Sequence, residues 1–223
     1  MTRTTNARIA GFTFLFYIVI GITSMMLFSQ ATGGETITGK LASIAQHVFQ
    51  VRLTILLGLL QAVCAIVLAV TLYAITRDQD SDLAILALTF RVGEGLLGAV
   101  ATRGTLELLW LGTASGPQAP DAATLQTLGT YLLNGPNSSM SAIFFAIGST
   151  LFSYLFLRAR TIPVLLASIG VVASVLLVVG LPLQLAGFVS GPVVSYLWIP
   201  MLAFEVPLAF WLLIKGVRTQ TNG

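Results

Sequence analysis

Long apolar stretches alternate with short polar segments along the whole of this chain. Three of the stretches, residues 10–28, 53–75 and 162–193, contain no charged residue. About 20 such residues cross the hydrocarbon core of a bilayer as one helix. With the interrupted stretches included, the pattern predicts six spans, at residues 9–28, 52–75, 83–106, 139–158, 162–188 and 193–215. We therefore expect an all-α fold, an integral membrane bundle of six transmembrane helices that forms one domain over residues 1–223.

Two longer segments between the predicted spans hold a helical pattern of their own. In both, apolar residues recur every three or four positions, as on one face of a helix. The two sets are Ile37, Leu41, Ile44 and Val48, and Ala122, Leu125, Leu128 and Leu132. Asp121 is a plausible N-cap for the second helix. We expect two outward-facing amphipathic segments that cap the bundle, because neither carries the Lys/Arg-rich polar face of a membrane-surface helix.

Basic residues near the ends of the spans predict the orientation. One side of the bundle holds seven of them: Arg3, Arg8, Arg77, Arg158, Arg160, Lys215 and Arg218. The other side holds three: Lys40, Arg52 and Arg103. Since the side richer in Lys and Arg faces the cytoplasm, both termini are predicted to be cytoplasmic. Trp198 then falls at the outer membrane interface, where amphipathic rings are enriched.

Composition narrows the class of protein further. The chain is 56% hydrophobic and 9% charged, whereas soluble domains carry about 25% charged residues. Its net charge of +3 is spread over helix ends and forms no cluster, which argues against a nucleic-acid partner. The single cysteine, Cys64, lies in an apolar stretch, and no motif for a metal or a cofactor is present. We therefore expect neither a metal site nor a cofactor.

Three charged residues, Arg91, Glu94 and Glu205, interrupt the predicted spans. A charge at the centre of a bilayer costs about 2.5–3.5 kcal/mol on the mildest scale, so such residues pair, face water or serve a function. At a rise of about 1.5 Å per residue, they lie ~13, ~18 and ~15 Å from the cytoplasmic ends of their spans, near the mid-plane. Arg91 can pair with Glu94 at i, i+3 or with Glu205 across two helices. Gln61, near the middle of the second span, could join them.

These residues leave three hypotheses open. In the first, a small transporter or permease-like protein uses Arg91, Glu94, Glu205 and Gln61 as a mid-plane site for a small molecule or a proton. Two carboxylates against one guanidinium favour it, since they leave a negative charge to neutralise. In the second, a non-catalytic membrane sensor or assembly partner uses the same charges as a structural lock. In the third, an intramembrane enzyme uses Glu94 or Glu205 as an acid or base. The sequence offers no second catalytic group, which favours a role other than catalysis.

Three short stretches resemble a known family. They are Ala7–Phe12, Phe90–Glu94, and Glu205 with Leu212–Val217 near the carboxyl terminus. In these stretches the chain is similar to the bacterial multi-pass membrane family catalogued as domain of unknown function 4386. The resemblance covers nearly the whole chain and implies a multi-helix protein of the bacterial inner (cytoplasmic) membrane. The family has no established activity, so the resemblance names no ligand. The lipid bilayer is the one expected partner besides the small-molecule or proton ligand.

Overall fold

A computed structural model describes residues 1–117, 119–134, 137–189 and 192–217 of the protein. Within these residues the chain forms eight helices and no strand, in agreement with the predicted all-α fold. The helices are α1 (Arg3–Ala31), α2 (Ile37–Gln46), α3 (Val48–Thr76), α4 (Ser81–Thr113), α5 (Ala122–Asn134), α6 (Asn137–Ala159), α7 (Val164–Leu185) and α8 (Pro192–Ile214).

Six of the helices, α1, α3, α4, α6, α7 and α8, are long and apolar enough to cross a membrane. They confirm the six predicted spans, although several ends differ from the predicted ones. Helix α1 begins at Arg3 rather than at residue 9, because Thr2 caps it by accepting the Thr5 N–H at 3.1 Å. Helix α4 continues to Thr113 rather than ending at 106. The bounds of an apolar stretch thus do not fix the bounds of the helix that contains it.

Large apolar side chains are exposed around the outside of all six long helices. One example from each helix is Phe12, Leu56, Leu96, Tyr154, Leu165 and Ile199. A monomeric soluble protein rarely exposes so continuous an apolar surface. The surface therefore fits a multi-pass membrane protein.

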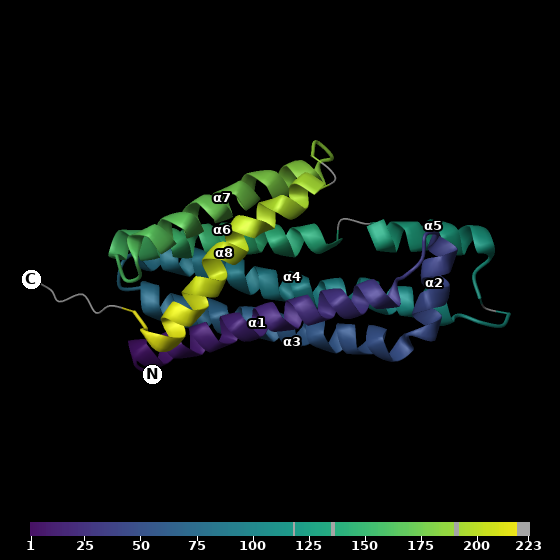
Figure 1. The fold of residues 1–223 in the computed structure, drawn as a ribbon, viewed down its shortest axis with the longest axis horizontal. Coiled ribbons are helices and arrows are strands. Elements are labelled where there is room, and N and C mark those ends of the chain that lie inside the picture. Colours follow the sequence, from purple (N-terminus) through teal and green to yellow (C-terminus); the bar gives the residue numbers. More distant parts are fainter. Residues whose placement is uncertain (118, 135–136, 190–191, 218–223) are drawn as a thin grey trace, which may run out of the picture.

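The six long helices follow one another in space in the order of the sequence. Each packs against the next, and α8 returns to pack against α1, which closes a ring. Figure 1 shows the start of α1 and the end of α8 at one end of the bundle, here called the terminal end, and α2 and α5 at the other, here called the capped end. Helices α4 and α8 lie on opposite sides of this ring, and their described residues make no direct backbone contact.

A glycine allows the ring to close between its first and last helices. A Cβ atom on Gly11 of α1 would lie 2.5 Å from the Leu213 nitrogen and 2.6 Å from the Ala209 carbonyl oxygen of α8. Both atoms belong to the backbone, so only a residue without a side chain permits this approach. Close contact through small residues is a common way for membrane helices to associate.

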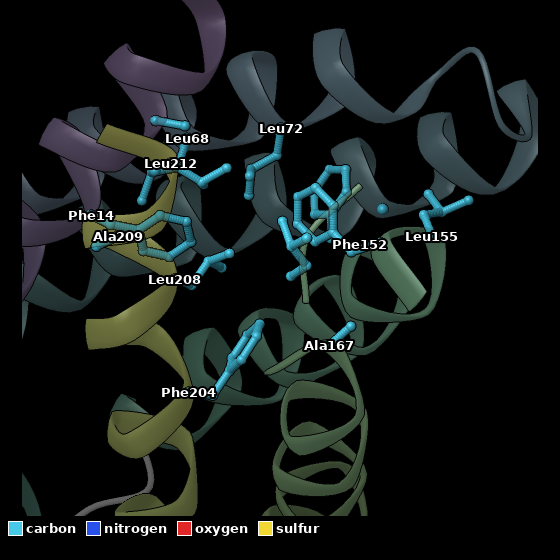
Figure 2. Close-up of a cluster of buried hydrophobic side chains, with 14 of the residues drawn as sticks. Phe14, Leu68, Leu72, Phe152, Leu155, Ala167, Phe204, Leu208, Ala209 and Leu212 are labelled. Carbon is cyan, nitrogen blue, oxygen red and sulfur yellow. The ribbon is translucent and has the colours of Figure 1, made fainter. Parts of the chain in front are cut away.

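The terminal half of the bundle is filled with apolar side chains. Figure 2 shows Phe14, Leu72, Phe152, Phe204 and Leu208 converging there from α1, α3, α6 and α8. All five are at most 4% exposed. The ring is therefore closed by packed side chains on the side of the termini.

The two short helices cap the other end, as the sequence predicted. Leu41 and Ile44 of α2 are buried in a second apolar cluster with Val51 of α3 and Leu108 of α4. Asp121 caps α5 by accepting the Thr124 N–H at 2.7 Å. This hydrogen bond holds the pKa of the Asp121 carboxyl below its usual value.

The predicted apolar face of α5 is wrong in part. Leu125 and Leu132 do pack on this second apolar cluster, but Leu128 is 40% exposed and Ala122 is exposed. Gly129 is the buried residue of α5, and a Cβ atom on it would lie 2.7 Å from Ile37 Cγ2 of α2. The close approach of two helices at a glycine therefore sets the orientation of α5, and a pattern of large apolar residues does not reveal it.

Candidate functional site

Arg91 and Glu94 form an ion pair on the inner face of α4. Arg91 Nη1 lies 2.8 Å from Glu94 Oε2, and the side chains are 1% and 3% exposed. The i, i+3 pairing that the sequence allowed is therefore present. Small residues on this face, such as Ala87 and Gly95, keep it close to neighbouring helices and away from lipid.

Helix α6 encloses the Arg91 side chain. The guanidinium carbon lies 4.8 Å from the centre of the Phe145 ring, a cation–π arrangement. A Cβ atom on Gly148 would lie 2.7 Å from Arg91 Cγ, so the arginine stem occupies the space beside this glycine. Among the described residues, Arg91 Nε, Nη1 and Nη2 have no acceptor in hydrogen-bond geometry. The contact with Glu94 is therefore an ion pair that depends on short distance rather than on alignment.

Glu94 has further partners on two other helices. The Tyr17 hydroxyl of α1 donates to Glu94 Oε1 at 2.9 Å, and the Ser141 hydroxyl of α6 donates to the Glu94 carbonyl oxygen at 3.0 Å. Each oxygen of the Glu94 carboxylate thus faces a charge or a donor. The Tyr17 and Ser141 hydroxyls therefore tie α1 and α6 to α4 at the level of the buried charges, while the Arg91–Glu94 ion pair lies within α4.

Glu205 reaches the same level from α8 but stands apart. Its side chain is buried, and it makes no hydrogen bond or ion pair with any described residue. The Arg91–Glu205 pair that the sequence also allowed is absent, because α4 and α8 face each other across the ring and Arg91 turns toward α6. Glu205 does lie near enough for its charge to interact with those of Arg91 and Glu94.

A cavity of about 360 Å³ occupies the centre of the ring between these groups. Five helices line it, and α3 and α4 contribute mainly glycines and alanines that leave the space open. Its larger side chains are Tyr17, Gln61, Glu94, Phe145, Trp198 and Glu205. The structure thus places Glu94, Glu205 and Gln61 around one cavity, while Arg91 lies behind its wall.

Two further cavities extend this space in opposite directions. One of about 380 Å³ shares Gln61 and Ala101 with the central cavity and reaches Leu132 and Leu133 of α5 at the capped end. Gln61 Nε2 reaches α1, since it lies 2.9 Å from where a Gly21 Cβ would stand. The other cavity shares Glu205 but measures only about 10 Å³. The central cavity therefore borders a second cavity toward the capped end, whereas little space lies beyond Glu205 toward the terminal end.

Sequence reasoning missed three lining residues. Tyr17 is the one polar aromatic residue within the uncharged stretch 10–28, and its position near the middle of that stretch could have revealed it. Phe145 had no signal among the many apolar residues of its span. Trp198 was assigned to the membrane interface, whereas its ring lies 5.8 Å from that of Phe145 and lines the cavity. Helix α8 also holds Pro200 and Pro207, and proline is a usual cause of kinks in helices.

Comparisons with known proteins bear on the family and not on the activity. No curated protein and no solved structure matches the chain. The model of one family, described as Domain of unknown function (DUF4386), matches residues 9–216, which includes every charged and aromatic residue of the central cavity. The chain belongs to this family of multi-helix membrane proteins.

Proposed function

We propose that the protein is a small transporter that binds a cation or a proton in its central cavity. The observation that carries this proposal is Glu205, a buried carboxylate without a partner on the wall of a cavity of about 360 Å³. Ionisable residues inside a membrane bundle mark ion or substrate pathways by default. Glu94 and Gln61 supply further polar atoms on the same wall.

The difference in free space on the two sides of the central cavity supports transport by alternating access. A transporter exposes a mid-plane site to one side of the membrane at a time. Here a second cavity of about 380 Å³ adjoins the central one at Gln61 on the capped side, whereas Phe152, Phe156 and Leu208 leave only about 10 Å³ beyond Glu205. Such an arrangement suits a state that is accessible from the capped end.

The proposed orientation places the termini and this closed side in the cytoplasm of a bacterial cell. Six of the seven basic residues that predict it belong to the terminal end, and Arg218 lies outside the described residues. A green fluorescent protein fused to the carboxyl terminus should fluoresce, and an alkaline phosphatase fused there should be inactive. The opposite pair of results contradicts the orientation.

The second candidate function is a membrane sensor or assembly partner in which the charges act as a lock. The Arg91–Glu94–Tyr17 group favours it, because hydrogen bonds from Tyr17 of α1 and Ser141 of α6 reach Glu94 of α4, which is also paired with Arg91. A lock of this kind needs no solvent access and no ligand. It also gives no role to Glu205, whose carboxylate makes no hydrogen bond or ion pair with another described helix.

Flux through reconstituted vesicles separates the two candidates. Proteoliposomes are loaded with the pH dye pyranine, an electrical potential is imposed, and both the internal pH and the uptake of radiolabelled tetraethylammonium are followed. We expect flux of the proton or of the organic cation above that of empty vesicles, and its loss in Glu205→Gln. The matched control is Glu107→Gln, a carboxylate outside the central cavity with an exposed side chain. The transport proposal is overturned if the wild type shows no flux of either ion, or if Glu205→Gln shows the same flux as the wild type. The lock is then the remaining candidate.

A further inference from the structure

We propose that the central cavity recognises an organic ammonium ion with an apolar body, with Glu205 as its counter-ion and aromatic rings as its walls. This inference rests on the proposed function, because it names the chemical class that the transporter would carry. The charge comes first. Glu205 is the carboxylate on the cavity wall that has no ion pair or hydrogen bond with a described residue, whereas Glu94 already faces Arg91 and Tyr17.

The aromatic side chains supply the second part of such a site. Tyr17, Phe145 and Trp198 line the cavity from three different helices, α1, α6 and α8. The Phe145 and Trp198 rings lie 5.8 Å apart at an angle of 32° and form one continuous wall. Aromatic faces attract ammonium groups, and cages of several rings with a carboxylate recognise quaternary ammonium ions. Trp198 belongs to the same helix as Glu205, so α8 supplies both the counter-ion and one of the rings.

The position of Arg91 permits a cation in the cavity. Its guanidinium packs against the Phe145 ring at 4.8 Å, and Phe145 rather than Arg91 lines the cavity. An incoming ammonium ion therefore meets the ring and the two carboxylates before it meets the arginine. An anion would meet the same wall first, where the unpaired Glu205 carboxylate would repel it. The geometry thus favours a positive charge.

The size of the cavity argues for an organic ligand. Its volume of about 360 Å³ falls at the lower end of the range of about 300–1,000 Å³ that is usual for sites of small molecules. Apart from Gln61 and Ser141, the remaining lining residues are glycines and alanines of α3, α4 and α6. These residues leave room beside the carboxylate for the apolar part of a ligand.

Binding to the full-length protein in lipid nanodiscs tests the inference. Radiolabelled tetraethylammonium is the probe, and the competitors are choline and its uncharged carbon analogue 3,3-dimethyl-1-butanol. We expect saturable binding that choline displaces and the alcohol does not, because only the charge differs between the two competitors. This comparison uses the wild-type protein, so it does not depend on the folding of any variant.

Two pairs of variants then assign the binding to the cavity. Glu205→Gln should weaken tetraethylammonium binding about 10- to 100-fold, and Glu107→Gln should leave it unchanged. Trp198→Leu should weaken it about 2- to 30-fold, the range of cation–π energies. Trp110→Leu is the matched control, since Trp110 is 56% exposed on α4 and lines no part of this cavity.

Two results of the competition and variant experiments overturn the inference. One is equal competition by choline and the uncharged alcohol, and the other is wild-type affinity in both Glu205→Gln and Trp198→Leu. Proton flux without saturable tetraethylammonium binding also overturns it, yet that result upholds the transport proposal with a proton as the ligand. Failure of the inference and failure of the proposed function are thus distinct.

Discussion

Two carboxylates face the same cavity from opposite sides of the helix ring, and their surroundings differ sharply. Glu94 on α4 has an ion pair with Arg91 at 2.8 Å and accepts the Tyr17 hydroxyl at 2.9 Å. Glu205 on α8 has neither an ion pair nor a hydrogen bond with a described residue. Both are buried and both belong to membrane-spanning helices.

The difference in partners separates a structural role from a ligand-binding role. From the sequence, Arg91, Glu94 and Glu205 were treated as one group with one role. A buried charge with partners on several helices contributes to the fold, and its loss leaves the partners uncompensated. A buried carboxylate without partners contributes no helix contact and leaves its acceptor atoms for a ligand. We therefore expect substitutions around Glu94 to change stability, and substitutions at Glu205 to change ligand binding and transport.

The largest expected effect is on the Glu94 side, in Arg91→Met. The substitution leaves the Glu94 carboxylate buried without its counter-ion, which typically costs about 3–5 kcal/mol. The free energy of unfolding, measured by titration with dodecyl sulfate in mixed micelles, should fall by that amount.

The double variant Arg91→Met/Glu94→Gln is the control for lost packing. Because it removes both charges, it should recover most of the stability, as neutral replacements of buried ion pairs do. A double variant no more stable than Arg91→Met would mean that the arginine stem, and not its charge, holds α4 and α6 together.

A smaller loss is expected when the space for the arginine is filled. In Gly148→Ala the new Cβ would stand 2.7 Å from Arg91 Cγ and 2.9 Å from Arg91 Cδ, so the side chain must move. Overpacking of this kind costs about 1–3 kcal/mol. Gly98→Ala is the matched control on the cavity wall, where the nearest atom would be Ser141 Oγ at 3.5 Å, an ordinary contact. Equal losses in the two variants, measured by the same titration, would show that the arginine side of the cavity is no more tightly packed than the rest.

This contrast between the two carboxylates was only partly readable from the sequence. The six spans followed from the long apolar stretches, and the Arg91–Glu94 pair followed from their i, i+3 spacing on one helix. Depth counting placed Glu205 at the same level. It could not tell whether Arg91 turns toward α8 or α6, because that choice depends on the space beside Gly148.

Other features depended on helix packing in the same way. Contact between α1 and α8, which closes the ring, relies on Gly11, and the orientation of α5 relies on Gly129. A single glycine in an apolar stretch carries no sign of the helix that will pack against it. Tyr17 and Trp198 became site residues only when the ring brought their helices to one cavity.

A still smaller loss of unfolding free energy is expected for Tyr17→Phe, which keeps the ring and removes the hydroxyl. Glu94 Oε1 loses its donor, and such hydrogen bonds in membrane proteins contribute about 1–2 kcal/mol at most. Tyr154→Phe is the control, because Tyr154 is 42% exposed on α6 and its side chain lies outside the site. Unfolding in dodecyl sulfate should distinguish the two variants. An equal effect would mean that the Tyr17–Glu94 hydrogen bond does not stabilise the fold.

The smallest change in stability is expected at Glu205 itself. Glu205→Gln keeps the shape of the side chain and removes a buried charge that has no partner, so the free energy of unfolding should be unchanged or higher by up to about 1 kcal/mol. The same substitution at Glu94 should instead lower stability, because it leaves Arg91 without its counter-ion. Measuring both glutamine variants under one set of conditions places the two carboxylates on a single scale. A loss above about 2 kcal/mol in Glu205→Gln would mean that this carboxylate also holds helices together, since an unpaired charge cannot contribute so much. Glu205 would then belong with Arg91 and Glu94 in one structural lock.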